Sequence, residues 1–115
     1  MPAGKSAPQA GHAYVDALLL SLQSPDDRIR SQAEAYARLR PGTKVCLDGG
    51  SAAQLDAIEA RLSAAGLPVA RIIDSGHVCP PDFDGSPILT ALGVGPITRD
   101  QAPRILKSLK LYGKE

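Results

Sequence analysis

The chain has 115 residues, of which 43% are hydrophobic and 22% are charged, with a formal net charge of +1. This length suits a single domain over residues 1–115, because it is enough to bury one core and short for two. The longest apolar cluster, residues 17–20, is far below the roughly 18 residues that a membrane-spanning helix needs, and the N-terminus lacks a secretory-signal pattern, so we expect a cytoplasmic protein.

Two helices are predicted in the first part of the chain. Between residues 9 and 22, apolar residues recur at spacings of three and four, which indicates one buried helical face: Tyr14, Val15, Leu18, Leu19 and Leu22. Pro8 fits the first turn of this helix. A second helix is predicted to start after Ser24 as its cap and to run to about Arg38.

A strand, a helix and a strand are predicted between residues 44 and 73. Residues 44–47 have the composition of a short buried strand, and residues 69–73 that of a second one. Between them, Ser51 and Gln54 form a capping-box pattern for a helix that Gly66 ends. Such a unit predicts a right-handed crossover between parallel strands, with helices packed on the sheet.

The last part of the chain is predicted to contain a third strand and a final helix. Residues 88–94 form the strand, and residues 79–87 before it are rich in turn formers and are expected to be irregular. Asp100 is predicted to cap a helix whose inward face carries Ile105, Leu106 and Leu109. The expected fold class is therefore α/β, with a small mixed sheet of three recognisable strands and helices on both faces.

The C-terminal segment is basic. From residue 99 onward, Asp100 and Glu115 are outnumbered by five cations, namely Arg99, Arg104, Lys107, Lys110 and Lys114. Such a segment could bind phosphate by Coulomb attraction, although a solvated helix face is the alternative interpretation. Aromatic residues make up 3% of the chain, which argues against a stacking platform for single-stranded bases.

Four motifs resemble those of one enzyme family. The first places Gln9 four residues after Lys5 of a Gly-Lys pair and continues to His12 of a His-Ala pair. Three more follow in the same order and at similar spacing along nearly the whole chain: Ile73-Asp74-Ser75-Gly76, Gly93-Val94-Gly95-Pro96 and Lys110-Leu111-Tyr112. With these motifs the chain resembles the peptidyl-tRNA hydrolases of the archaeal and eukaryotic type.

The resemblance implies hydrolysis of the ester between the peptide and the terminal ribose of peptidyl-tRNA, without a metal or an organic cofactor. The reaction needs a positioned water, stabilisation of an oxyanion and a proton for the departing hydroxyl. Lys5 and Asp74 are the candidate catalytic residues. Lys5 could stabilise the oxyanion or hold a phosphate, while Asp74 could accept hydrogen bonds from the attacking water and keep the Lys5 ammonium charged.

Four other residues are candidates for substrate binding, namely Gln9, His12, His77 and Thr90. Gln9 follows Lys5 by one helical turn and would share its face. The candidates also have ordinary structural explanations. A lysine near a helix start, such as Lys5, is ordinarily solvated, and an aspartate before Ser-Gly, such as Asp74, ordinarily caps a turn. A helical histidine such as His12 is more often interior or a cap. The two histidines and the two cysteines, Cys46 and Cys79, lack paired ligand spacing, so no metal site is expected and the thiols are expected to be reduced.

Three departures from the family pattern leave other functions open. The pattern has Arg and Thr where this chain has His77 and Val78, and the loop that follows is longer than usual, with Thr90 matched to a second Thr. A catalytically degenerate member that binds tRNA or a protein partner without turnover is therefore the alternative. A small α/β interaction module without a nucleic-acid role is a third possibility, favoured by the near-neutral charge.

The remaining departure concerns the sheet. The family has a further strand, ending in an Asp, before the segment matched by residues 1–5, which gives the family four strands. A sheet without that strand has an unpaired edge, and such an edge is a template for pairing with another chain. We therefore expect a homodimer, or pairing with residues ahead of Met1 in a longer product.

Overall fold

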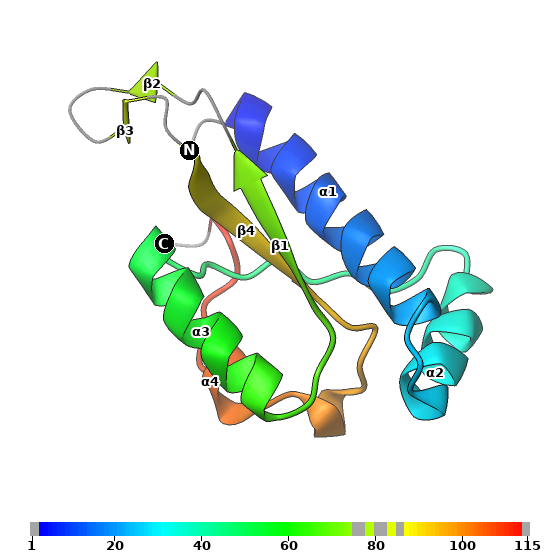
Figure 1. Cartoon of the computed structure of the whole chain (residues 1–115). Helices are drawn as coiled ribbons and strands as arrows, with labels where there is room; N and C mark the ends of the chain where they lie inside the picture. Colours follow the sequence, from blue (N-terminus) through cyan, green and yellow to red (C-terminus); the bar gives the residue numbers. More distant parts are fainter. Residues whose placement is uncertain (1–2, 75–77, 80–82, 85–86, 114–115) are drawn as a thin grey trace.

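The computed structural model describes residues 3–74, 78–79, 83–84 and 87–113 (Figure 1). Its helices are α1 (Ala3–Leu22), α2 (Asp27–Ala37), α3 (Ala52–Ala64) and α4 (Arg104–Lys107), with a 3-10 turn η1 (Arg99–Gln101) before α4. Its strands are β1 (Val69–Asp74), β2 (Val78–Cys79), β3 (Phe83–Asp84) and β4 (Ile88–Val94). Across the described ranges, no helix has the length and apolar character needed to cross a membrane.

Strands β1 and β4 pair antiparallel and form the sheet on which the helices pack. Val69 lies opposite Val94, and Asp74 lies opposite Ile88, so the end of β1 is next to the start of β4. Two of the three predicted strands thus form this sheet. The stretch predicted to be irregular contains a second, two-residue ladder in which β2 pairs antiparallel with β3.

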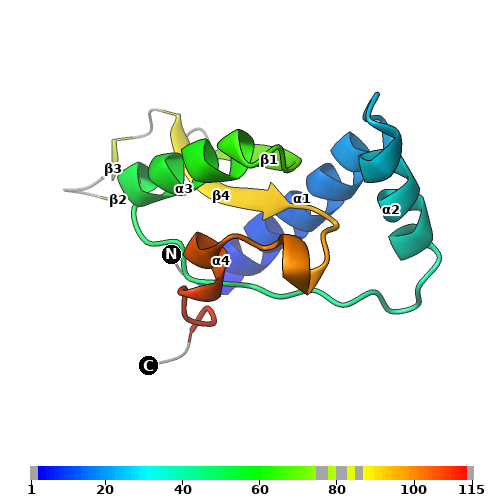
Figure 2. The same cartoon turned by 90° about the horizontal axis from the view of Figure 1, so that it is seen from below.

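Helices α1 and α3 cover opposite faces of the sheet (Figures 1 and 2). A side chain at Gly93 would overlap the backbone of α1, so this position faces α1. The preceding residue, Leu92, lies opposite Arg71, whose guanidinium pairs with Asp56 and Glu59 of α3. Because successive residues of a strand point to opposite faces, the two helices lie on different sides. The predicted α/β fold with helices on both faces is confirmed.

Small residues let α1 lie close to the sheet. Ala13, Ala17 and Ser21 recur at a spacing of four residues, which places them in one row on the helix, and all three are buried. The Ser21 hydroxyl donates a hydrogen bond of 2.8 Å to the carbonyl of Gly95, just beyond β4. Helix α2 packs beside the second half of α1 with Ala33 buried (Figure 1).

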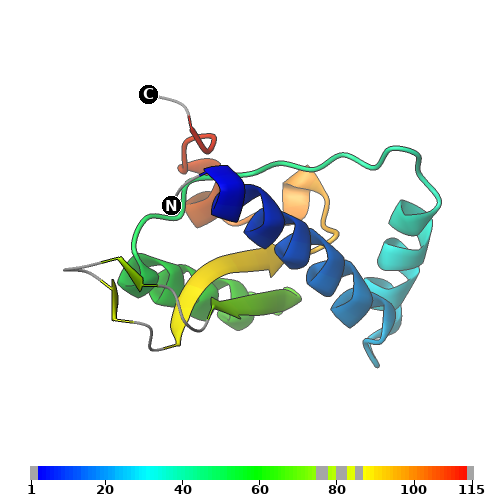
Figure 3. The ribbon, with the colours of Figure 1, turned by 90° about the horizontal axis from the view of Figure 1, so that it is seen from above.

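Residues 44–47, predicted as a buried strand, form no strand. They belong to the connection between α2 and α3, which runs back along the length of the molecule (Figures 2 and 3). Leu47 makes an isolated antiparallel bridge to Leu111, and the adjacent Asp48 N–H donates to the Lys110 carbonyl at 2.8 Å. The partner of this segment is the C-terminal chain and not β1, so the predicted parallel crossover is wrong.

Two helix starts also differ from the prediction. Helix α1 begins at Ala3, so Pro8 lies inside it; a proline there removes one hydrogen bond, to the carbonyl four residues earlier, without preventing the preceding turn. The cap of α2 is Asp26, whose carboxylate accepts from the backbone amides of Arg28 and Ile29, whereas the Ser24 hydroxyl accepts from the Asp26 N–H. The turn before the helix uses the serine and leaves the aspartate as the cap.

The C-terminal helix is shorter than predicted. Thr98, and not Asp100, caps η1 through a capping box with Gln101, and Pro103 separates this turn from α4. Proline cannot donate the backbone hydrogen bond that would join the two. The residues predicted to face inward are all half-buried, namely Ile105, Leu106 and Leu109. The capping box of α3, formed by Ser51 and Gln54, is confirmed.

Candidate active site at the end of strand β1

The row of α1 residues that faces the sheet, formed by Ala13, Ala17 and Ser21, extends toward the N-terminus of the helix through two of the motif residues. Gln9 lies four residues before Ala13, and Lys5 lies four residues before Gln9, so all three share one side of the helix. For Lys5 the structure describes the backbone in α1 and not the side chain. The predicted common face of Lys5 and Gln9 is therefore present in the helix, and it is the face turned toward the sheet.

The packing of α1 on β4 brings this row to the level of Asp74. Ala13 and Ala17 contact the position of Gly93. From Gly93 back to Ile88 a strand covers about 16 Å, at about 3.3 Å per residue. The same distance along a helix is about 11 residues, at about 1.5 Å each, which leads from Ala13 and Ala17 back to the first turns of α1. Ile88 lies opposite Asp74, so both motifs lie at one end of the sheet.

The pleat of β1 points Asp74 to the same side as this row. Arg71 faces α3, as its ion pairs with that helix require. Alternation then turns Ile72, which is buried, and Asp74, which is half-buried, toward the α1 face. In Figure 1 the arrowhead of β1 points toward the end of the sheet at which α1 begins. A carboxylate and a helix row that begins with a lysine thus lie on the same face at the same end.

Gln9 has an unusual environment at this end. Its side-chain oxygen Oε1 is buried and has no hydrogen-bond partner among the described residues. A buried oxygen without a partner costs about 1–3 kcal/mol, so proteins rarely retain one unless a ligand or water satisfies it. Gln9 lies on the row of α1 that faces the sheet, and its contact with substrate stays a prediction.

Thr90 lies on β4 at the level of the register shift in the ladder. Its hydroxyl donates a hydrogen bond of 3.2 Å to the Ile72 carbonyl, two residues before Asp74. The hydroxyl proton is therefore used within the sheet, and the oxygen retains only acceptor capacity toward a substrate. Sequence alone matches Thr90 to a motif position, while its bonding partner becomes visible only with the strand register.

The two histidines differ from this group. His12 is exposed on α1 and lies outside the row of Lys5, Gln9 and Ala13. His77 lies outside the described residues. For Val78, at the start of β2, the structure describes the backbone and not the side chain. Substrate binding by either histidine stays a prediction.

Tyr14 on α1 has a clearly shifted pKa. Burial raises the pKa of Tyr14 above its ordinary value, and the neighbouring Cys46 and Tyr36 side chains raise it further. Tyr14 thus joins α1 to the connection between α2 and α3. Its neutral phenol is favoured, and its role is in packing this segment.

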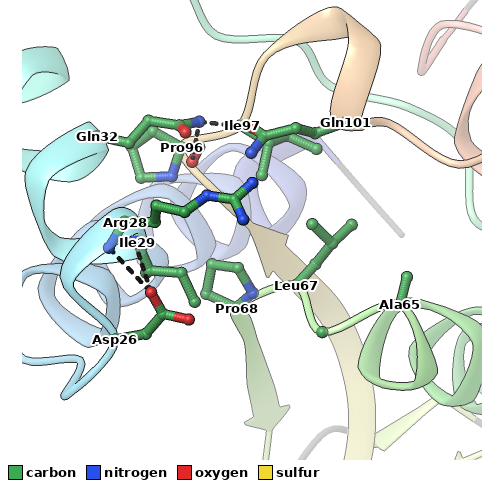
Figure 4. A pocket seen from close by; sticks show the side chains of 11 residues that line it. Asp26, Arg28, Ile29, Gln32, Ala65, Leu67, Pro68, Pro96, Ile97 and Gln101 are labelled. Atoms are coloured by element: carbon green, nitrogen blue, oxygen red, sulfur yellow. Dashed lines mark hydrogen bonds between the residues drawn. The ribbon is translucent and has the colours of Figure 1, made fainter.

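The described cavities lie at the other end of the sheet. One of about 280 Å³ is formed where β1 begins and β4 ends, between α2 and the turn after α3 (Figure 4). A second of about 310 Å³ adjoins it and shares four of its lining residues, namely Ile29, Gly66, Leu67 and Pro68. None of the motif residues at the Asp74 end lines either cavity.

The polar groups around the first cavity, of about 280 Å³, are occupied in holding the fold. The Asp26 carboxylate caps α2. The Gln32 amide donates to the Pro96 carbonyl at 3.1 Å and to the Gln101 side chain at 2.7 Å, as Figure 4 shows. Arg28 is exposed beside them. No motif in the sequence predicts this cavity, because its lining comes from separate segments of which only Pro96 belongs to a quoted motif. Its chemistry is structural, and the Asp74 end is the better candidate site.

Comparison with known proteins gives a family for nearly the whole chain. Residues 1–112 match the family described as Peptidyl-tRNA hydrolase PTH2. The chain is similar to the peptidyl-tRNA hydrolase of Pyrobaculum aerophilum, with 37% identity over 111 residues that cover 95% of this chain and 85% of that protein. It is also similar to the peptidyl-tRNA hydrolase of Aeropyrum pernix, with 35% identity over 112 residues that cover 97% of this chain and 86% of that protein.

Proposed function

The chain belongs to the PTH2 family of peptidyl-tRNA hydrolases, and we propose that it hydrolyses the ester bond of peptidyl-tRNA and so recycles stalled tRNA. The observation that carries the proposal is the match over residues 1–112, which includes every motif at the Asp74 end. The placement of the Lys5 and Gln9 row on the same face as Asp74 supports it. No cofactor is part of the proposal.

The chemistry assigns a role to each of three residues. The Asp74 carboxylate accepts a hydrogen bond from the water that attacks the ester carbon. The Lys5 ammonium stabilises the oxyanion that forms there. The bond from the carbon to the ribose oxygen then breaks, and this oxygen takes up one proton as it leaves, which balances the proton that the attacking water gives up. The buried Gln9 amide orients the ester or the water. His12 and His77 are proposed to bind substrate farther from the reacting bond.

The basic C-terminal segment is proposed to bind the tRNA. Arg104, Lys107 and Lys110 are all exposed on and after α4, and each cation that meets a phosphate adds to the salt dependence of binding. Affinity for tRNA should therefore fall steeply as the salt concentration rises. The same measurement separates a tRNA-binding protein from an interaction module without a nucleic-acid role.

A homodimer through the edge of β4 is a further proposal. Within the described sheet, β4 pairs with β1 along one edge, and an open edge is a template for another strand. Light scattering at several protein concentrations tests it. A monomer at all concentrations, with a cooperative thermal transition, would remove the need for a second chain.

The catalytically degenerate alternative rests on Val78, which stands where the family pattern has a hydroxyl. If it is correct, the purified chain binds tRNA in a salt-dependent way and releases no peptide from peptidyl-tRNA. A slow but measurable release supports the enzyme. Val78→Thr, which is nearly isosteric but adds a hydroxyl, should then raise the rate.

Replacement of Lys5 tests the proposed mechanism. Lys5→Ala should lower peptide release by about a hundredfold, because it removes the charge that stabilises the oxyanion, while the thermal transition stays unchanged. The matched control is Lys44→Ala, which removes an exposed lysine from the connection between α2 and α3. Equal rates for the two variants with saturating substrate would refute the role of Lys5.

A further inference from the structure

The ladder between β1 and β4 contains one extra residue close to the proposed site. Ile72 lies opposite Ala91, and the next residue of β1, Ile73, lies opposite Leu89. β4 therefore advances by two residues where β1 advances by one, and the unmatched residue is Thr90. This is a β-bulge, a device that bends a strand pair and redirects nearby side chains.

The bulge decides which part of β4 flanks Asp74. If the register of Val69 to Ile72 continued without a bulge, Asp74 would lie opposite Leu89. With the bulge, Asp74 lies opposite Ile88. Because side chains alternate along a strand, a shift of one residue exchanges the faces of the β4 residues beyond the bulge, Leu89 and Ile88, relative to β1. The surroundings of Asp74 thus depend on where the bulge sits.

The side chain of the bulged residue fixes the bulge. The Thr90 hydroxyl donates to the carbonyl of Ile72, the last β1 residue before the register shift, at 3.2 Å. A bulge disrupts the ladder locally, and a half-buried carbonyl without a partner is unfavourable. The hydroxyl supplies a donor to this carbonyl from the residue that causes the disruption.

We propose that Thr90 is a positioning residue, which fixes the bulge through its hydroxyl and thereby sets which β4 residues flank Asp74 and how the end of β1 lies against the row of Lys5 and Gln9. This inference deepens the proposed function and rests on it, since it takes Asp74 as the residue that holds the attacking water. It also gives Thr90 a role other than the predicted direct contact with substrate.

Three variants separate the hydroxyl from the shape of the side chain. Thr90→Val keeps the shape and removes the donor, whereas Thr90→Ser keeps the donor. Because displacement of a reacting group by about 1 Å can cost about a hundredfold in rate, Thr90→Val should lower kcat roughly tenfold or more, with KM within about twofold of wild type. Thr90→Ser should restore most of the rate. Thr43→Val, at an exposed threonine, is the matched control and should leave the rate unchanged.

A second readout does not depend on activity. The carbonyl carbon shift of Ile72 in NMR should change in Thr90→Val and stay near its wild-type value in Thr90→Ser. If Thr90→Ser is as slow as Thr90→Val, or if the Ile72 shift is the same in all three proteins, the positioning inference is wrong. Asp74→Asn, measured in parallel, separates failure of the proposed function from failure of the positioning role of Thr90. A wild-type rate for Asp74→Asn overturns the proposed function. A wild-type rate for Thr90→Val alone overturns only the positioning role.

Discussion

The two ends of the β1 and β4 sheet use their polar groups differently. At the end where β1 begins, Ser21 and Gln32 bond to the carbonyls of Gly95 and Pro96, so polar side chains hold the chain in place. At the end where β1 stops, a bulge interrupts the ladder and Gln9 keeps a buried oxygen without a partner among the described residues. The described cavities lie at the first end, whereas Asp74 and the row of α1 with Lys5 and Gln9 lie at the second. A void alone is therefore a poor guide to the reactive part of this protein.

The largest expected effect on stability comes from filling the close contact of α1 with β4. Gly93→Ala places a methyl group against the backbone of Ala13, so the helix must shift, which should cost about 3 kcal/mol in the free energy of unfolding. Gly11→Ala is the control, since an added methyl meets nothing within 4 Å and should stabilise the helix by about 0.5–1 kcal/mol. Urea denaturation measures both. Equal stabilities would mean that α1 is not seated on Gly93.

Removal of the buried hydroxyl beside Gly95 is next in size. Ser21 is fully buried and its hydroxyl donates to the Gly95 carbonyl. Ser21→Ala should therefore destabilise the protein by about 2 kcal/mol, because the carbonyl loses its donor, while kcat of the folded protein stays at the wild-type value. A fall in kcat without a fall in stability would show that the two ends are not separate in function.

The same substitution at both ends should have opposite effects on stability. Gln9→Leu removes an oxygen that has no partner in the part of the chain that the structure describes and should raise the free energy of unfolding by about 1 kcal/mol, whereas Gln32→Leu removes two hydrogen bonds and should lower it by about as much. Peptide release should fall in Gln9→Leu alone. Loss of stability in both variants would indicate that Gln9 has a structural partner.

The smallest effect is a pH dependence at Tyr14. Because its pKa is raised in the folded state, the stabilisation is fully present below the unfolded pKa of about 10 and is lost as the pH rises through the higher folded value. Tyr14→Phe should lose less stability than wild type between about pH 8 and about pH 11. Chemical denaturation at both pH values measures this, and identical losses would contradict it.

Sequence predicted the elements whose signals are local. The capping box at Ser51 and the apolar strands at residues 69–73 and 88–94 are confirmed, because each depends on neighbouring residues. The strand predicted at residues 44–47 is wrong, since a short apolar run does not specify its pairing partner. The role of Thr90 depends on strand register, and the Gln9 oxygen without a partner within the described ranges depends on packing, so neither could be read from a motif. The single domain and the cytoplasmic location stay predictions.

The most direct test of the account compares the same substitution at two aspartates in a single-turnover assay of peptide release from peptidyl-tRNA. Asp74→Asn should slow release by about a hundredfold, since the neutral amide is a weaker acceptor for the attacking water. Asp56→Asn should stay within about twofold of wild type, because Asp56 lies on α3 in an exposed pair with Arg71. A wild-type rate for Asp74→Asn would contradict the assignment of the reaction to the end of β1.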